Sequence, residues 1–193
     1  MGRKGDARRQ QILEAAKKIL MESGPEAFVL RDIAEKIGIT HGNLQYYFRT
    51  RHDLLVAIFD QEVEKYTNSM QESIAATSTR RGRLAAIIDS GLAVLRTPET
   101  ALWRMIISMA DHNEEVSAIL KKENDLYEAV LAKELKQIAP KLSPQRRRHV
   151  AKIVRAMLDG LAVQFIHEDP ESADMKALQT EMKAVIFALV DAD

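Results

Sequence analysis

The chain has 193 residues, no cysteine, and 28 basic against 28 acidic residues, which gives a formal net charge of zero. The lack of cysteine excludes disulfide bonds and thiolate metal sites, while 46% apolar residues suffice for a sizeable core. The opening segment MGRKGDARRQQ lacks the apolar centre of a signal peptide and no apolar run reaches membrane-spanning length, so we expect a cytoplasmic protein without a membrane partner.

Basic residues gather near the N-terminus. Residues 1–55 hold ten Lys or Arg and seven Asp or Glu, whereas residues 56–193 hold eighteen and twenty-one. Arg3, Lys4, Arg8 and Arg9 form a basic arm that leads into a first helix, which ends near Ser23-Gly24-Pro25. A solvated terminus and a contact with nucleic acid are both compatible with such an arm.

Residues 30–48, LRDIAEKIGITHGNLQYYF, predict two short helices joined by a tight turn. Apolar residues recur at helical spacing from Leu30 to Ile37, which defines one buried stripe on the first helix. Gly38 follows at the point where the helix end favours a residue that tolerates positive φ. Ile39 fills the turn, and Thr40 is a good N-cap for the second helix.

The second helix, residues 41–48, has an apolar side and a polar side. Leu44, Tyr47 and Phe48 are its inward anchors. The outward positions carry side chains that can hydrogen-bond, namely His41, Asn43, Gln45 and Tyr46. This layout is typical of a helix-turn-helix whose second helix enters a DNA major groove, and it is less typical of an ordinary helix in a bundle.

The same residues resemble a known family. GITHGNLQYYFRTRHDLL is similar to the end of the DNA-binding domain of TetR-family regulators, with matches at Gly38, Thr40, Gly42, Leu44, Tyr47, Phe48, Arg51 and Leu54. RQQILEAAKKILMESGPEAF resembles the first helix of that domain and its exit. The chain departs from the pattern at Val29, where a Thr or Ser cap is usual, and at Gln45, where Tyr is common.

The resemblance implies a homodimer on a palindromic double-stranded DNA operator, most simply as a repressor. It assigns phosphate contacts to Arg31, Thr40, Tyr47 and Arg51, and close approach of the backbone to Gly42. The base-reading candidates are His41, Asn43, Gln45 and Tyr46, because Asn and Gln can pair bidentately with adenine.

The rest of the chain carries only helical patterns, so we predict an all-α fold of about nine helices. A three-helix head, residues 1–50, precedes a helical effector-binding and dimerisation domain, residues 51–193. A long helix, residues 51–76, contains neither Gly nor Pro and is expected to bridge the two. Ser143-Pro144 marks another helix start, and the helix that follows is apolar on more than one side.

The excess apolar surface of the last two helices favours a homodimer, although a monomer core would also use it. The predicted interface residues are Val154, Leu158, Leu161, Phe165, Met182, Ile186 and Leu189. The resemblance points the same way, because these two helices build a four-helix interface in the family.

The family also holds an effector cavity in this domain. Aromatic and methionine side chains at helical spacing are more often core than pocket, yet some could line such a cavity: Tyr66, Met70, Trp103, Ile107, Tyr127 and Phe165. The C-terminal half bears some resemblance to the betaine-responsive branch, but the identity of the effector stays open.

We find no sequence pattern for catalysis, a cofactor or a metal. The five histidines are scattered, and the group around His112 is more typical of a solvated loop than of a metal site. We therefore expect a DNA-binding regulator that is not an enzyme and responds to an unknown small molecule. Two alternatives remain, a helical ligand-binding protein whose helix-turn-helix does not bind DNA, and an enzyme that uses the cavity.

Overall fold

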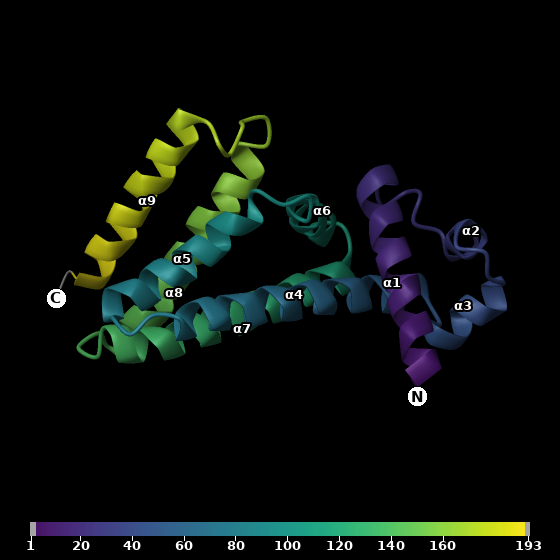
Figure 1. Ribbon diagram of the computed structural model, residues 1–193, viewed down its shortest axis with the longest axis horizontal. Coiled ribbons are helices and arrows are strands. Elements are labelled where there is room, and N and C mark those ends of the chain that lie inside the picture. The colour runs from purple at the N-terminus through teal and green to yellow at the C-terminus, as the bar shows by residue number, and fades with distance from the viewer. Residues whose placement is uncertain (1–2, 192–193) are drawn as a thin grey trace. The chain divides into compact units, whose positions relative to one another are not determined.

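The computed structural model describes residues 3–191, and within that span it is all-helical, as predicted (Figure 1). The described residues form nine helices, which are α1 (Arg3–Ser23), α2 (Leu30–Lys36), α3 (His41–Tyr47), α4 (Arg51–Ala75), α5 (Arg80–Val94), α6 (Thr100–Ala110), α7 (Glu114–Ile138), α8 (Pro144–Gln164) and α9 (Ala173–Asp191). No helix of this part of the chain combines the length and the apolar character needed to cross a membrane.

The predicted basic arm is not a separate segment. The backbone is already helical at Arg3, so the arm forms the first turns of α1. The guanidinium of Arg9 lies 5.0 Å from the centre of the Phe48 ring. A cation over an aromatic face contributes to packing, so Arg9 belongs at least partly to the structure of the head.

Side-chain caps define where several helices begin. Thr40, Thr79, Asn113 and Ser143 each accept a hydrogen bond from a backbone N–H in the first turn of the following helix. The predicted start at Ser143-Pro144 is therefore confirmed, because the Ser143 hydroxyl accepts from the N–H of Arg146 at 3.1 Å.

The described chain forms two compact units whose boundary lies inside α4, between Lys65 and Tyr66. The sequence prediction placed the boundary between residues 50 and 51. The difference arises because the first part of α4 is tied to α1, where the Lys17 ammonium donates to the Glu62 carboxylate at 3.0 Å. Both side chains are largely buried, so this ion pair fixes α4 in the N-terminal unit.

The core of the C-terminal unit is built from α5, α7, α8 and α9, with α6 against α7 and α8. In Figure 1 the yellow α9 lies beside α8 and α5, in agreement with the packing of these three helices. The side chains at the centre of this core come from four helices and include Ile87, Leu135, Val150, Val154 and Ile186. The helix α6 lines a pocket, which is described below.

Candidate functional site

The turn between α2 and α3 is fixed by backbone geometry. Gly38 has φ of +71°, and its N–H donates to the carbonyl of Glu35 at 3.1 Å. The N–H of Ile39 donates to the carbonyl of Ala34 at 3.0 Å. This pair of hydrogen bonds is a Schellman motif, which needs a left-handed residue after the helix and so favours glycine at position 38.

The second helix of the motif begins and anchors as predicted. The Thr40 hydroxyl accepts a hydrogen bond from the N–H of Asn43 at 3.2 Å, which caps α3. Leu44 and Phe48 are buried, and Tyr47 is half-buried with its ring edge-on to Tyr46 at 5.1 Å. These anchors determine which face of α3 is turned outward.

The outward face of α3 is polar and exposed. Its members are His41, Gly42, Asn43, Gln45 and Tyr46, and Tyr46 has 71% of its surface exposed. Thr40, at the start of α3, and Arg31, in the first turn of α2, are exposed as well. Donors, acceptors and one aromatic ring are therefore displayed on a helix of the size that fits a major groove.

Arg51 differs from the other predicted DNA contacts. Its Nε donates to the carbonyl of Phe28 at 3.0 Å, and one terminal nitrogen donates to the carbonyl of Pro25 at 2.8 Å. These bonds hold the loop between α1 and α2 against the start of α4. Arg51 thus has a structural role inside the head, and its contact with phosphate stays a prediction.

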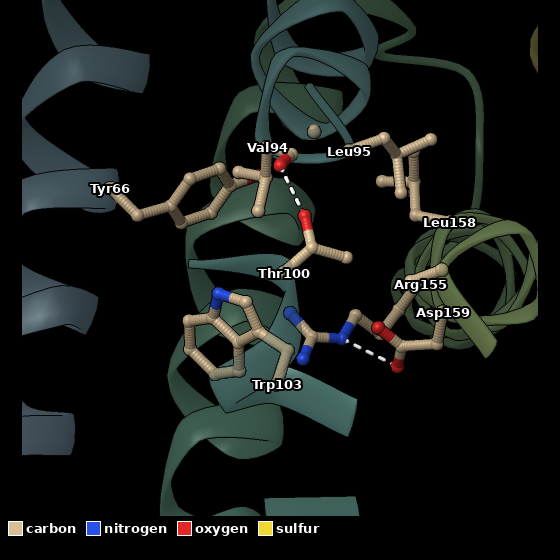
Figure 2. A pocket seen from close by; sticks show the side chains of 10 residues that line it. Tyr66, Val94, Leu95, Thr100, Trp103, Arg155, Leu158 and Asp159 are labelled. Carbon is tan, nitrogen blue, oxygen red and sulfur yellow. Dashed lines mark hydrogen bonds and ion pairs between the residues drawn. The ribbon is translucent and has the colours of Figure 1, made fainter. Parts of the chain in front are cut away.

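A small pocket, with a cavity volume of about 40 Å³, lies within the C-terminal unit. Its lining comes from α4, α5, α6 and α8 and consists of Tyr66, Gly91, Val94, Leu95, Thr100, Trp103, Arg155, Leu158, Asp159 and Ala162. Figure 2 shows Tyr66 and Trp103 on one side and the Arg155–Asp159 pair on the other. A mostly apolar lining with a few polar groups is typical of small-molecule sites.

Local packing determines how the pocket walls meet. A side chain at Gly91 would place its Cβ 2.5 Å from Leu158, so glycine permits the close approach of α5 to α8. At the end of α5 the Thr100 hydroxyl donates to the carbonyl of Val94 (Figure 2). This bond gives a partner to the Thr100 hydroxyl, which α6 contributes to the lining.

Arg155 is the central charge of the pocket. Its Nε donates to Oδ2 of Asp159, one helical turn further along α8, at 2.8 Å. Its guanidinium carbon lies 5.6 Å from the centre of the Trp103 ring and 5.2 Å from that of Tyr127. Burial raises the pKa of Asp159, and the nearby Arg155 opposes that effect.

Two tyrosines extend the aromatic wall. The rings of Tyr66 and Tyr127 stack with their centres 6.3 Å apart. Burial raises the pKa of Tyr66 to about 12 and raises that of Tyr127 well above its ordinary value. Both phenols are therefore neutral over the physiological pH range.

The structure brings together only some of the predicted pocket residues. Tyr66 and Trp103 line the pocket. Tyr127 stacks on Tyr66, and the Arg155 guanidinium lies over the Tyr127 ring. Met70, Ile107 and Phe165 are not part of its lining. Sequence reasoning missed Arg155 and Asp159, although a charged pair at i, i+4 within an apolar stretch of helix was a usable signal.

The predicted dimer interface stays a prediction. Within a single chain, Val154, Leu158, Leu161, Met182 and Ile186 are buried in the core of the C-terminal unit. Leu189 is partly buried and Phe165 is exposed. The apolar side chains that α8, its C-terminal end and α9 do expose are Ile153, Val163, Phe165, Ile166 and Val185, each 36% to 49% accessible.

Two family models match the chain. Residues 12–58 match the model described as bacterial regulatory proteins of the tetR family. Residues 80–188, more than half of the chain, match the model described as BetI-type transcriptional repressor, C-terminal. The first range contains the helix-turn-helix, and the second contains every pocket residue except Tyr66.

Individual proteins also match over most of the chain. The HTH-type transcriptional regulator BetI of Rhizobium meliloti is 28% identical over 177 residues, which cover 90% of this chain and 86% of that protein. A transcriptional regulator from Saccharomonospora viridis, crystallised with choline, has a TM-score of 0.74 at 18% identity and covers 96% of both chains. Salmonella enterica GusR has a TM-score of 0.77 at 19% identity over 95% of both chains. At these identities the two solved structures show a common fold.

Proposed function

Because the chain belongs to the TetR family of bacterial regulatory proteins and is a DNA-binding transcriptional regulator of the repressor type, we propose that it is a ligand-responsive repressor. In this proposal it binds a palindromic operator as a homodimer, and a small molecule in the C-terminal unit releases it. The observation that carries the proposal is the exposed polar face of α3, anchored from behind by Leu44 and Phe48.

A single α3 offers too few base contacts for an operator-specific affinity. Specific protein–DNA interfaces usually bury on the order of 1,000–2,500 Å² of protein surface, which favours two heads on two half-sites. A two-fold dimer sets the spacing of those half-sites at about one helical turn of DNA. The exposed apolar side chains of α8 and α9 support such a dimer, because apolar surface of this kind is costly to leave in water.

The ligand response is supported by the course of α4. Its first part is held in the N-terminal unit by Arg51 and Glu62, and its Tyr66 lines the pocket of the C-terminal unit. One helix thus connects the DNA-binding head covalently with the pocket wall. A ligand that binds one position of α4 more tightly than another shifts the population toward that position and changes the spacing of the two heads.

The relatives support a small-molecule effector without naming it. The Saccharomonospora viridis regulator was crystallised with choline, which shows that this fold can hold a small organic molecule. The pocket of the present chain has its own charge arrangement, however, so the effector has to be derived from its own side chains.

The DNA-binding part is tested with DNA that flanks the gene of this protein. Binding is measured by fluorescence anisotropy over a salt series, for the wild type and for Gln45→Ala, whose side chain is exposed on α3. We expect tight, sequence-selective binding that Gln45→Ala weakens by about five- to a hundredfold, the usual range for losing one base contact. Gln71→Ala, an exposed glutamine on α4, is the matched control and should bind like the wild type.

The salt series separates specific from nonspecific binding. Contacts with phosphates make affinity fall with salt for every sequence, whereas base contacts preserve the ratio between operator and random DNA. Weak binding that is equal for all sequences, and unaffected by Gln45→Ala, would overturn the proposal. The protein would then be better described as a helical ligand binder.

A further inference from the structure

The pocket already contains a cation at the place where an aromatic cage would receive one. The Arg155 guanidinium lies over the faces of both Trp103 and Tyr127. A quaternary ammonium ligand would have to displace it or bind beside it, and like charges at close range repel each other. The charge arrangement of this pocket therefore disfavours a cationic ligand.

Arg155 also has unused hydrogen-bond donors. A guanidinium carries five N–H groups, and the one on Nε is used by Asp159. Within residues 3–191, no carbonyl or side chain accepts a hydrogen bond from the two terminal nitrogens of Arg155. In Figure 2 these nitrogens point from Arg155 toward Trp103, into the pocket. Two parallel N–H donors match the two oxygens of a carboxylate.

The remaining wall is apolar. Val94, Leu95, Leu158 and Ala162 line the pocket next to the charged pair. Hydrocarbon buried there is stabilised by about 25 cal/mol per Å² removed from water. A phosphate dianion fits less well, because Asp159 offsets the single positive charge of Arg155 and the lining contains no second cation.

We propose that the pocket binds a small organic monocarboxylate, whose head group is received by the terminal nitrogens of Arg155 and whose apolar body packs against Leu95 and Leu158. This inference names the chemical class of the effector, and to that extent it rests on the proposed function. Asp159 competes with the ligand carboxylate for the same guanidinium, so its presence weakens carboxylate binding.

Binding can be measured without DNA, because Trp103 is the only tryptophan of the chain and lies in the pocket wall. Its fluorescence is titrated with the straight-chain carboxylates from acetate to octanoate, with the corresponding neutral amides, and with choline. We expect a saturable change with a carboxylate of four to eight carbons, and about ten- to hundredfold weaker binding of the amide of equal length. Choline should bind more weakly than the best carboxylate.

Three variants test the role of the charged pair. Arg155→Gln should abolish carboxylate binding, and Arg155→Lys should retain part of it, because lysine keeps the charge but not the fork of two donors. Asp159→Asn should tighten carboxylate binding, since it removes the competing anion. Arg148→Gln, on an exposed position of the same helix, is the matched control and should bind like the wild type.

The results distinguish this inference from the proposed function. Tighter binding of choline than of every carboxylate, equal binding of carboxylates and amides, or no fluorescence change with any carboxylate would each overturn the inference. Operator release is measured separately by anisotropy. A carboxylate that binds through Arg155 but leaves operator affinity unchanged would support the inference and overturn the ligand response. Operator release by choline alone would overturn the inference and support the ligand response.

Discussion

At the scale of single residues, the character of the pocket depends on what covers two aromatic rings. Trp103 and Tyr127 could form a site for a cation in isolation, but Arg155 lies over both of them. The aromatic side chains could be picked out from the sequence, whereas the position of the Arg155 guanidinium over their rings could not. Helical spacing tells which residues share a face of one helix, but it does not tell which residue of another helix lies opposite.

Tyr66, a partly buried tyrosine of the pocket wall, gives a pH dependence. Tyr66 has its pKa raised from 10.0 to about 12, mainly by burial, so the folded chain holds this proton more tightly than the unfolded chain. The resulting stabilisation is complete below pH 10 and is lost as the pH rises through about 12. We expect the free energy of unfolding to fall more steeply with pH in this window for the wild type than for Tyr66→Phe, which has no proton to lose.

Urea unfolding followed by far-ultraviolet circular dichroism at several pH values between 9 and 12 measures this difference. The other titrating groups are common to both proteins, but Tyr127 is coupled to Tyr66, so the comparison reports on the stacked tyrosine pair. Parallel pH profiles for the two proteins would show that Tyr66 ionises equally easily in the folded and unfolded chains.

At the scale of elements, the helix-turn-helix could be predicted in detail because its signals are local. Gly38 ends α2 in the left-handed region, and Thr40 caps α3. Each of these features depends on neighbours within a few residues. The ion pair between Lys17 and Glu62 joins residues 45 positions apart, and nothing in the local pattern indicates it. The place inside α4 where the two compact units divide depends on such long-range contacts in the same way.

The helix α2 begins without a side-chain cap. Val29 occupies the N-cap position with φ of −107° and ψ of 126°, and it makes no side-chain cap hydrogen bond. Threonine has the same shape as valine but offers a hydroxyl oxygen, which can accept from the N–H of Asp32. We expect Val29→Thr to stabilise the head by about 0.5–2 kcal/mol.

The gain is measured as an increase in the free energy of urea unfolding at neutral pH. Val29 is 45% exposed, so the loss of one methyl group costs little buried apolar surface. Val29→Ala is the control, because it changes the same side chain without supplying an acceptor, and it should bring no gain. Equal stability of the threonine and alanine variants would show that the cap is not limiting.

At the scale of the whole molecule, the sequence predicted that α8 is too apolar for an ordinary surface helix, and the structure agrees. Of the residues predicted for an interface, Val154 and Ile186 are buried in the core of a single chain. A helix that is apolar on two sides gives no internal signal of which side meets its own chain. That choice depends on where α5 and α9 pack, which is a property of the complete fold.

The outer faces of α8 and α9 lead to the prediction for the assembly. Val163 and Val185 are 44% and 49% exposed, and glutamate at both positions would place charges in an apolar interface. We expect Val163→Glu combined with Val185→Glu to convert a dimer into a monomer of 21.8 kDa, measured by light scattering coupled to size-exclusion chromatography. Circular dichroism should remain unchanged, because neither side chain belongs to the core.

The same double variant should lose operator affinity by a factor on the order of a hundred or more, because a monomer binds one half-site and loses the specific contacts of the other. Leu126→Glu is the matched control, since Leu126 is 41% exposed and belongs to α7 rather than to α8 or α9. It should remain dimeric and bind the operator like the wild type. A double variant that stays dimeric would place the interface on another face. If the wild type is monomeric at the concentration at which it binds the operator, each head acts alone. The proposal that one dimer binds two half-sites would then be wrong.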